Sequence, residues 1–133
     1  MPLKTLPVLK RLVYVSRVAA HLTEMNVQRI QWSSQVRNRR LDLTGMLVFT
    51  GRHFAQVLEG REEALRELMA SVRRDARHSD LKVVVEQPIT QRRFDGWAMG
   101  YANRYEMADV AEELLQGRPA TPEVIEQLFN AAA

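Results

Sequence analysis

Residues 43–60, LTGMLVFTGRHFAQVLEG, contain two apolar segments that are separated by Gly51 and Arg52. Both segments, residues 43–50 and 53–59, are rich in the β-branched and aromatic side chains that favour buried strands. A short turn that contains glycine between two such segments predicts a β-hairpin. Gly60 follows and is expected to end the second strand. The hairpin is the most clearly patterned part of the chain, and the remaining elements are predicted around it.

The chain before this hairpin predicts a strand and then a helix. Residues 11–16, RLVYVS, have the composition of a strand with both faces covered. Thr23 is a favourable N-cap residue and precedes a helical pattern over about residues 24–38.

The chain after the hairpin predicts a second helix and two more strands. Residues 62–77 form an amphipathic helical pattern whose apolar face contains Leu65, Leu68, Met69, Val72 and Ala76. Residues 81–87 predict a fourth strand, and residues 94–101 predict a fifth.

The order βαββαβ, with one strand more, predicts an α+β fold. Right-handed crossovers place both helices on one face of a single sheet, which is the ferredoxin-like sandwich. Two C-terminal helices are expected over residues 105–116 and 122–130, the first ended by Gly117 and the second begun by Thr121. Their apolar stripes need a surface, so we expect them to cover the other face of the sheet.

Composition excludes several classes of protein. The 133 residues suffice for one domain, and 46% hydrophobic with 26% charged residues is ordinary globular composition. Without cysteine, the chain has no disulfide, thiolate metal site or cysteine nucleophile. No apolar run approaches the roughly 20 residues that cross a bilayer. We therefore expect a soluble, cytoplasmic protein that does not contact membranes.

The charge balance is weakly basic. Lysine and arginine number 19 against 16 acidic residues, which gives a net charge of +3. Binding to a nucleic-acid backbone requires many simultaneous basic contacts. We expect the arginine pairs at residues 39–40, 73–74 and 92–93 to be solvated, and we expect no nucleic-acid partner.

Two polar side chains are predicted among apolar neighbours. Gln56 alternates in phase with Phe54 and Leu58, so its amide is expected to be buried. Tyr14 lies on the first strand, which neighbours the third in this topology, and its hydroxyl can reach Gln56. The pair could simply satisfy polar groups of the core or could be functional, and periodicity does not decide between the two.

Residues at three other places can also be interpreted either as ordinary structural residues or as functional ones. The helix face that begins with Val27 and Ile30 becomes polar at Ser34 and Asn38, as at a helix end or at the edge of a ligand. Trp97 and Met99 share one strand face, which is usual for a core. Three residues that close the second helix and its exit turn could complement the helix end or hold a phosphate or ring carbonyl, namely Asp75, Arg77 and His78.

Sequence motifs of enzymes are absent. The chain contains none of the common nucleotide-binding, zinc-protease or serine-hydrolase motifs, and its three histidines lack metal-ligand spacing. Acylphosphatases share the βαββαβ order and use an arginine and an asparagine, but the loop after the first strand has no glycine to cradle a phosphate.

The chain resembles the BLUF domain, a blue-light sensor that uses FAD. The resemblance covers about residues 12–100 and is carried by RLVYVSR, SSQVRN, LTGMLVF, FAQVLEG, RRDARHS and PITQRRFDGWAMG, in this order. It implies a photosensory domain over residues 10–104, and the two predicted C-terminal helices would form a helical hairpin over residues 105–131, packed on the sheet. It also implies bound FAD, or FMN in its place.

The resemblance implies roles for particular residues. Ile30 and Val72 would sandwich the flavin ring, and Asn38 would hydrogen-bond its polar edge. Tyr14 and Gln56 match the photoactive pair, and Trp97 and Met99 match the strand that switches. The implied cofactor-binding residues are Tyr14, Ile30, Ser34, Arg37, Asn38, Phe54, Gln56, Val72, Asp75, Arg77 and His78. Arg37 departs from the Asn or His that family members often carry there.

A light-driven switch follows from these roles. Excited flavin is a strong oxidant, and Tyr14 could supply an electron and then a proton through Gln56. The Gln56 amide would reorganise by rotation or tautomerisation, strengthen a hydrogen bond to the flavin C4 carbonyl and shift absorption to the red. Trp97 and Met99 would then respond to the new state of Gln56.

The output is expected to be a protein contact rather than catalysis. We expect a homo-oligomer, with Trp32 on the outer side of its helix as one candidate anchor, and an unidentified downstream protein partner. Two alternatives are a flavin-free ferredoxin-like module that senses a small ligand and a flavin enzyme. The first leaves the buried Gln56 unexplained, and the second lacks an evident acid, base or substrate site.

Overall fold

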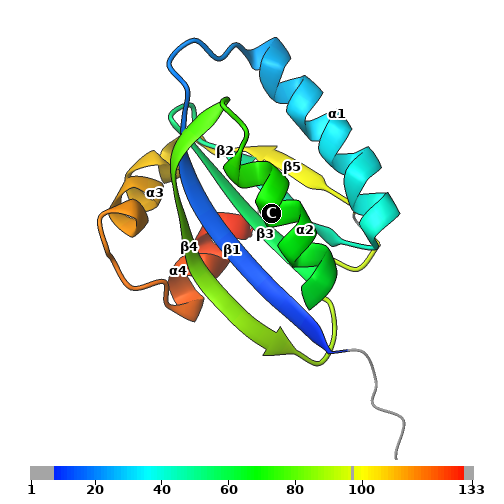
Figure 1. Ribbon diagram of the computed structural model, residues 1–133. Helices are drawn as coiled ribbons and strands as arrows, with labels where there is room; N and C mark the ends of the chain where they lie inside the picture. The colour runs from blue at the N-terminus through cyan, green and yellow to red at the C-terminus, as the bar shows by residue number, and fades with distance from the viewer. Residues whose placement is uncertain (1–7, 97, 131–133) are drawn as a thin grey trace, which may run out of the picture.

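A five-stranded sheet with helices on both faces forms the protein (Figure 1). The computed structural model describes residues 8–96 and 98–130. Its strands are β1 (Leu9–Val18), β2 (Thr44–Phe49), β3 (His53–Arg61), β4 (His78–Ile89) and β5 (Gly100–Asn103). Its helices are α1 (Glu24–Leu41), α2 (Glu62–Arg73), the 3₁₀ turn η1 (Tyr105–Met107), α3 (Ala108–Leu115) and α4 (Pro122–Phe129).

The strand order β4-β1-β3-β2-β5 places β3 at the centre. β3 pairs antiparallel with β1 and with β2, and the edge strand β5 runs parallel to β2. In the β1–β3 register, Tyr14 lies directly opposite Gln56. The predicted α+β, ferredoxin-like fold is confirmed. The predicted hairpin is also present, and Gly51 adopts a φ of 94° in its turn, a conformation that glycine takes without steric strain.

Helix α1 begins where the sequence predicts. The Thr23 hydroxyl accepts a hydrogen bond from the Asn26 backbone amide at 3.2 Å, and the Thr23 backbone amide donates one to Asn26 Oδ1 at 3.1 Å. This capping box satisfies N–H groups that the first turn leaves unpaired. The helix continues to Leu41, three residues beyond the predicted end, and stops at Asp42 in a left-handed conformation.

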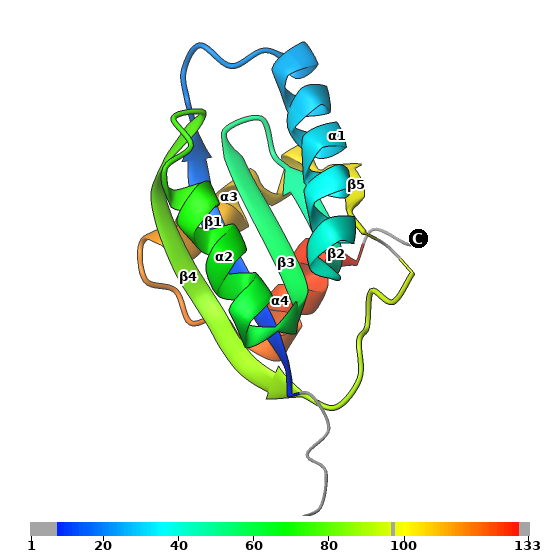
Figure 2. The ribbon, with the colours of Figure 1, turned by 45° about the vertical axis from the view of Figure 1, so that its right-hand side comes forward.

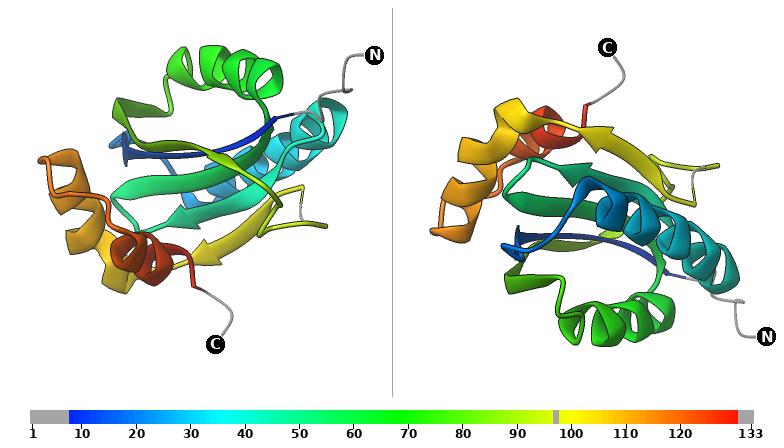
Figure 3. Two further views of the ribbon diagram at one scale, coloured as in Figure 1. Left: turned by 90° about the horizontal axis from the view of Figure 1, so that it is seen from below. Right: turned by 90° about the horizontal axis from the view of Figure 1, so that it is seen from above.

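Helices cover both faces of the sheet (Figure 3), and a hydrophobic core lies on each face. One lies under α1 and α2 and includes Leu58, Leu65 and Leu68. The other lies under α3 and α4, where Leu114 and Leu128 are completely buried against the odd-numbered residues of β1 and β3. The C-terminal helices therefore cover the second face, as predicted. No helix in the described part of the chain is long and apolar enough to cross a bilayer.

The fifth strand is shorter than predicted, because the segment before it is held by a buried side chain. β5 covers residues 100–103 rather than 94–101. The fully buried Glu59 carboxylate accepts hydrogen bonds at 2.9 Å from the backbone amides of Arg93 and Phe94. Arg11 donates to the same carboxylate at 2.7 Å. These backbone amides therefore bond to a side chain, and the described residues before β5, 91–96 and 98–99, lie in turns and irregular structure.

Helix α2 also ends earlier than predicted, at Arg73 instead of about residue 77. The Asp75 carboxylate accepts a hydrogen bond from the Arg77 backbone amide at 3.0 Å. This local bond competes with the helical pattern and turns the chain out of the helix. Ala76 is consequently exposed, and its predicted place on the apolar face of the helix is wrong.

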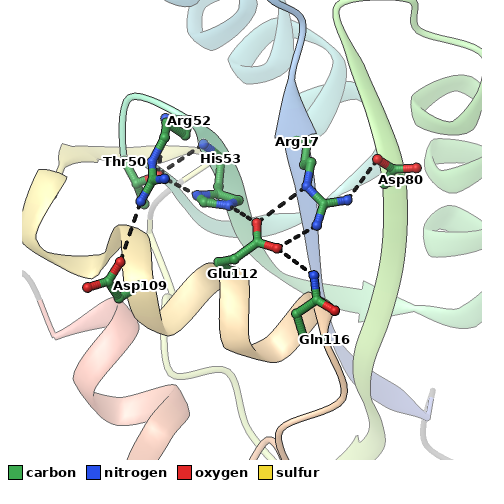
Figure 4. A network of polar contacts seen from close by, with 8 residues as sticks. All are labelled: Arg17, Thr50, Arg52, His53, Asp80, Asp109, Glu112 and Gln116. Carbon is green, nitrogen blue, oxygen red and sulfur yellow. Dashed lines mark hydrogen bonds and ion pairs between the residues drawn. The ribbon is translucent and has the colours of Figure 1, made fainter.

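Helix α3 is attached to the sheet by a network around Glu112 (Figure 4). Arg17 on β1 donates to the Glu112 carboxylate at 2.5 Å, and the buried His53 on β3 lies at 2.9 Å from it. Gln116 donates to the same carboxylate at 2.8 Å, and Arg17 reaches Asp80 on β4 at 2.8 Å. The hydrogen bonds from Arg17, His53 and Gln116 lower the pKa of Glu112 to about 2.

This depressed pKa predicts an acid-dependent contribution of Glu112 to stability. The contribution is complete above the ordinary pKa of 4.5 and is lost as the pH falls through about 2. Glu112→Gln should therefore lower the free energy of unfolding at neutral pH. Between pH 4.5 and about 2, the free energy of unfolding of this variant should fall less steeply with decreasing pH than that of wild type. Urea unfolding across this range measures both effects. Glu123→Gln, in the exposed first turn of α4, is the control, and equal pH profiles for Glu112→Gln and wild type would contradict the assignment.

Candidate functional site

Helices α1 and α2 lie over the same face of the sheet (Figure 2). Residues of both helices and of the sheet line a cavity. Its free volume is about 40 Å³, and its wall combines aromatic, aliphatic and charged side chains. The lining residues are Tyr14, Ile30, Ser33, Ser34, Arg37, Leu47, Phe54, Gln56, Val72, Asp75, Arg77 and His78. They come from α1, from α2 and the turn that follows it, and from strands β1, β2, β3 and β4, so the site exists only in the folded protein.

A buried tyrosine and a buried glutamine form the floor of the cavity. The Tyr14 hydroxyl donates a hydrogen bond to Gln56 Oε1, and the two residues are 4% and 2% exposed. The Gln56 amide nitrogen donates to the Met99 sulfur at 3.3 Å. A thioether is a weak acceptor, whereas a primary amide has two N–H donors to satisfy. Gln56 is therefore firmly bonded on its oxygen side and poorly bonded on its nitrogen side.

Burial keeps the Tyr14 phenol neutral. Loss of solvent raises the pKa of Tyr14 far above its ordinary value of 10, and the nearby Arg37 charge only partly opposes this effect. The hydroxyl therefore retains the proton that it shares with Gln56 throughout the physiological pH range.

Two polar atoms on α1 are buried without a hydrogen-bond partner in the described structure. They are Asn38 Oδ1 and Arg37 Nε. Asn38 is completely buried, and its amide nitrogen donates to the Ala98 carbonyl at 2.9 Å, which fixes the side chain. Burial also lowers the pKa of Arg37. An unsatisfied buried polar atom costs about 1–3 kcal/mol, so an acceptor and a donor on adjacent residues point to a ligand with both kinds of group.

The opposite side of the cavity contains a rigid ionic and hydrogen-bonded group. Arg77 donates to both oxygens of Asp75, at 2.9 and 2.6 Å, and this pairing holds the pKa of Asp75 below its usual range. His78 bridges the Ser16 hydroxyl and the Val72 carbonyl, each at 2.7 Å. The carbonyl only accepts, so His78 Nε2 carries a proton, and in the neutral ring Nδ1 accepts from Ser16.

The structure brings the predicted cofactor-binding residues together. All of them line the cavity except Asn38, which follows Arg37 in α1 and is completely buried. Met99 is buried against Gln56, while Trp97 lies outside the described residues. Their roles toward a cofactor remain predictions at this point. No group of metal-ligating side chains occurs among residues 8–96 and 98–130.

Sequence reasoning missed Ser33 and Leu47 in the cavity wall and Ser16 beneath it. Leu47 could have been found, because it pairs with Gln56 in the hairpin register. Ser33 follows Ile30 by three residues, so the same helical spacing could have indicated it. The contact between Ser16 and His78 depends on the β1–β4 pairing, whose register shifts between Val15 and Arg17, and no local pattern predicts such a shift.

The raised pKa of Tyr14 predicts its behaviour in an alkaline titration. Tyr14 should remain neutral up to at least about pH 11, so wild type and Tyr14→Phe should form the same amount of tyrosinate below that pH. Ultraviolet absorbance measures tyrosinate directly, with Tyr105→Phe as the control that removes an exposed phenol. Because the fold favours the neutral phenol, the contribution of neutral Tyr14 to the free energy of unfolding is complete below about pH 10 and is lost only as the pH rises above that value. A smaller tyrosinate signal in Tyr14→Phe below pH 11 would contradict this burial effect.

Comparison with known proteins identifies a family for this site. The family model described as BLUF, sensors of blue-light using FAD, matches residues 9–100. The dark-state structure of the BLUF protein BlrB superposes with a TM-score of 0.78 and 35% identity, covering 93% of this chain and 94% of that one.

Longer proteins contain similar segments. The photoactivated adenylate cyclase subunit alpha of Euglena gracilis is 31% identical over 120 residues, which cover 90% of this chain and 11% of that protein. The blue light- and temperature-regulated antirepressor BluF of Escherichia coli is 30% identical over 86 residues, which cover 65% of this chain and 21% of that protein. This chain spans 11–14% of the length of the photoactivated adenylate cyclases that it matches. The match over most of its length shows that the chain belongs to the BLUF family, the sensors of blue light using FAD.

Proposed function

We propose that the cavity between α1 and α2 binds the isoalloxazine ring of FAD and that Tyr14 and Gln56 form the photoactive pair. The observation that carries this proposal is the unpaired acceptor of Asn38 beside the unpaired donor of Arg37. A flavin ring has an N–H group between two carbonyls, so its polar edge supplies the partners that these atoms lack. Ile30 from α1 and Val72 from α2 provide apolar walls for the ring.

Binding of the ring requires one side chain to move. The free volume of about 40 Å³ accommodates a few water molecules but not three fused rings. Arg37 is the long side chain on the α1 wall, and within the described residues no carboxylate forms an ion pair with it. We infer that Arg37 swings aside when the ring enters and then satisfies its Nε donor against the ring edge.

The hydrogen bonds of Gln56 suit it to act as the switch. A bound flavin would absorb blue light and, in its excited state, would take one electron from a nearby donor. Tyr14 would supply that electron and release its proton along the hydrogen bond to Gln56 Oε1. The Gln56 amide is free to reorganise, by rotation or tautomerisation, because its nitrogen is held only by the weak acceptor of Met99. This change would remove the contact to Met99 and alter the packing of the loop that ends in β5.

The loop then connects the switch to helix α1. Gln35 donates to the Met99 carbonyl at 3.2 Å, and Asn38 donates to the Ala98 carbonyl. A displacement of residues 98–99 therefore acts directly on α1. The other end of the loop is fixed to β3 by Glu59, so the movement would be confined to the part nearest the cavity.

The matched region is a sensory domain, and we propose that the chain catalyses no reaction of its own. Residues 10–104 would form the photosensory unit, with the hairpin of residues 105–131 packed on its sheet. Among similar proteins, the domain occurs in light-regulated cyclases, which supports an output through contact with another protein or domain. We further propose that the protein self-associates and acts in the cytoplasm, and that FMN can replace FAD, since a solved structure of the similar BlrP1 contains FMN.

An absorption spectrum before and after blue light tests the proposal. The purified protein loaded with FAD should show a small, reversible red shift, which Gln56→Leu should abolish without loss of the bound flavin. Gln28→Leu, on the exposed side of α1, is the control and should shift like wild type. A red shift of normal size in Gln56→Leu would refute the role of Gln56. Failure of the wild-type protein to retain any flavin would refute the site as a whole.

A further inference from the structure

Helix α1 carries a line of exposed apolar side chains on the face directed away from the sheet. Met25, Trp32 and Val36 are 63%, 69% and 53% exposed. The buried residues of the same helix, Val27, Ser34 and Asn38, are on its other side. α1 lies at the margin of the helical layer, and no described element covers its outer side (Figure 2). Large apolar side chains rarely gather on a free surface without a binding role.

Two arginines complete this line. Met25, Arg29, Trp32, Val36 and Arg39 follow one another at intervals of four and three residues, and we call these five residues the α1 seam. Such spacing places side chains in one row along a helix and is the spacing by which one helix packs along another. The seam covers four turns, about 21 Å at 1.5 Å per residue. A partner helix of ordinary length would therefore match it.

The positive charges of helix α1 that lie on and beside the α1 seam have no acidic partners among the described residues. α1 contains four arginines against the single Glu24, an excess equal to the +3 net charge of the whole chain. Some arginines elsewhere on the surface, such as Arg17, Arg93 and Arg104, form ion pairs. Among the described residues, no carboxylate lies within ion-pair distance of Arg29, Arg39 or Arg40.

We propose that the α1 seam is a docking surface for an acidic amphipathic helix of a partner protein. Apolar side chains of that helix would cover Met25, Trp32 and Val36, and carboxylates between them would pair with Arg29 and Arg39. A large aromatic flanked by arginines is also the composition in which binding energy concentrates at protein interfaces. The surface does not depend on bound flavin, although the same helix forms one wall of the cavity.

Other occupants fit the seam less well. A second copy that crossed at Trp32 by two-fold symmetry would bring two uncompensated basic helices together. A bilayer would bury Met25 and Trp32, but Arg29 lies in the same row and would be drawn in with them. A nucleic acid would use the arginines and leave Met25 and Val36 exposed to water. Apolar and basic side chains alternate along the α1 seam, so a helix that carries apolar and acidic side chains is complementary to it.

Binding of designed helical peptides tests the proposal. The probe is a fluorescent peptide of about 20 residues, long enough for the seam, with leucine on one face and glutamate beside it. A second peptide has lysine in place of glutamate. Fluorescence anisotropy in the dark should show at least about tenfold tighter binding of the glutamate peptide to the wild-type protein. Trp32→Ala should weaken this binding by about tenfold or more, and so should Arg29→Gln combined with Arg39→Gln.

The controls separate this result from unfolding and from general charge. The substituted side chains are exposed, so circular dichroism and flavin content should match those of wild type. Arg73→Gln combined with Arg74→Gln removes two exposed arginines from the end of α2 and should leave binding unchanged.

Three outcomes would overturn the proposal. Equal binding of both peptides, or binding that survives Trp32→Ala, would show that the seam does not recognise an acidic helix. Binding only to vesicles of phosphatidylglycerol, lost in the same variants, would assign the seam to a lipid surface. Dimerisation lost in Trp32→Ala, without peptide binding, would assign it to a second copy.

Discussion

The hydrogen bond between Tyr14 and Gln56 is the interaction on which the site depends. It joins two buried polar side chains at directly opposed positions of β1 and β3, in the middle of a largely apolar sheet face. A buried amide is stable only when its donors and acceptor are satisfied, and Gln56 has a strong partner on one side and a weak one on the other. This unequal bonding holds the amide in one arrangement and makes a second arrangement accessible at low cost. A sensor needs two such states whose balance a stimulus can change.

The fold supplies a rigid frame around this adjustable residue. β3 lies in the centre of the sheet between two hydrophobic cores, so its backbone has little freedom to move. Glu59 on the same strand anchors one end of the following loop, while Gln56, Gln35 and Asn38 contact its other end. A change at Gln56 can therefore spread through the loop near Met99 to α1. On the other face, His53 and Arg17 hold α3 through Glu112, so β3 and β1 have polar contacts in both layers.

Much of this structure follows from the sequence, because periodicity and capping are local properties. The hairpin, the Thr23 cap, the two helical layers and the opposition of Tyr14 and Gln56 could all be predicted. The errors occur where side chains bond to the backbone over a distance or within a turn. Glu59 captures the amides of Arg93 and Phe94 and shortens β5, and Asp75 turns the chain before α2 reaches its predicted end. The resemblance to the BLUF family named most of the cavity wall, whereas the unpaired atoms of Arg37 and Asn38 became visible only in three dimensions.

A crystal structure of the protein with bound FAD in the dark would test the central claim most directly. The account predicts that the ring lies between Ile30 and Val72, that Asn38 Oδ1 and Arg37 Nε both gain partners on its polar edge, and that Arg37 has moved from its place in the cavity wall. A ring bound elsewhere, or a ring in this cavity that leaves both atoms unpaired, would contradict the account.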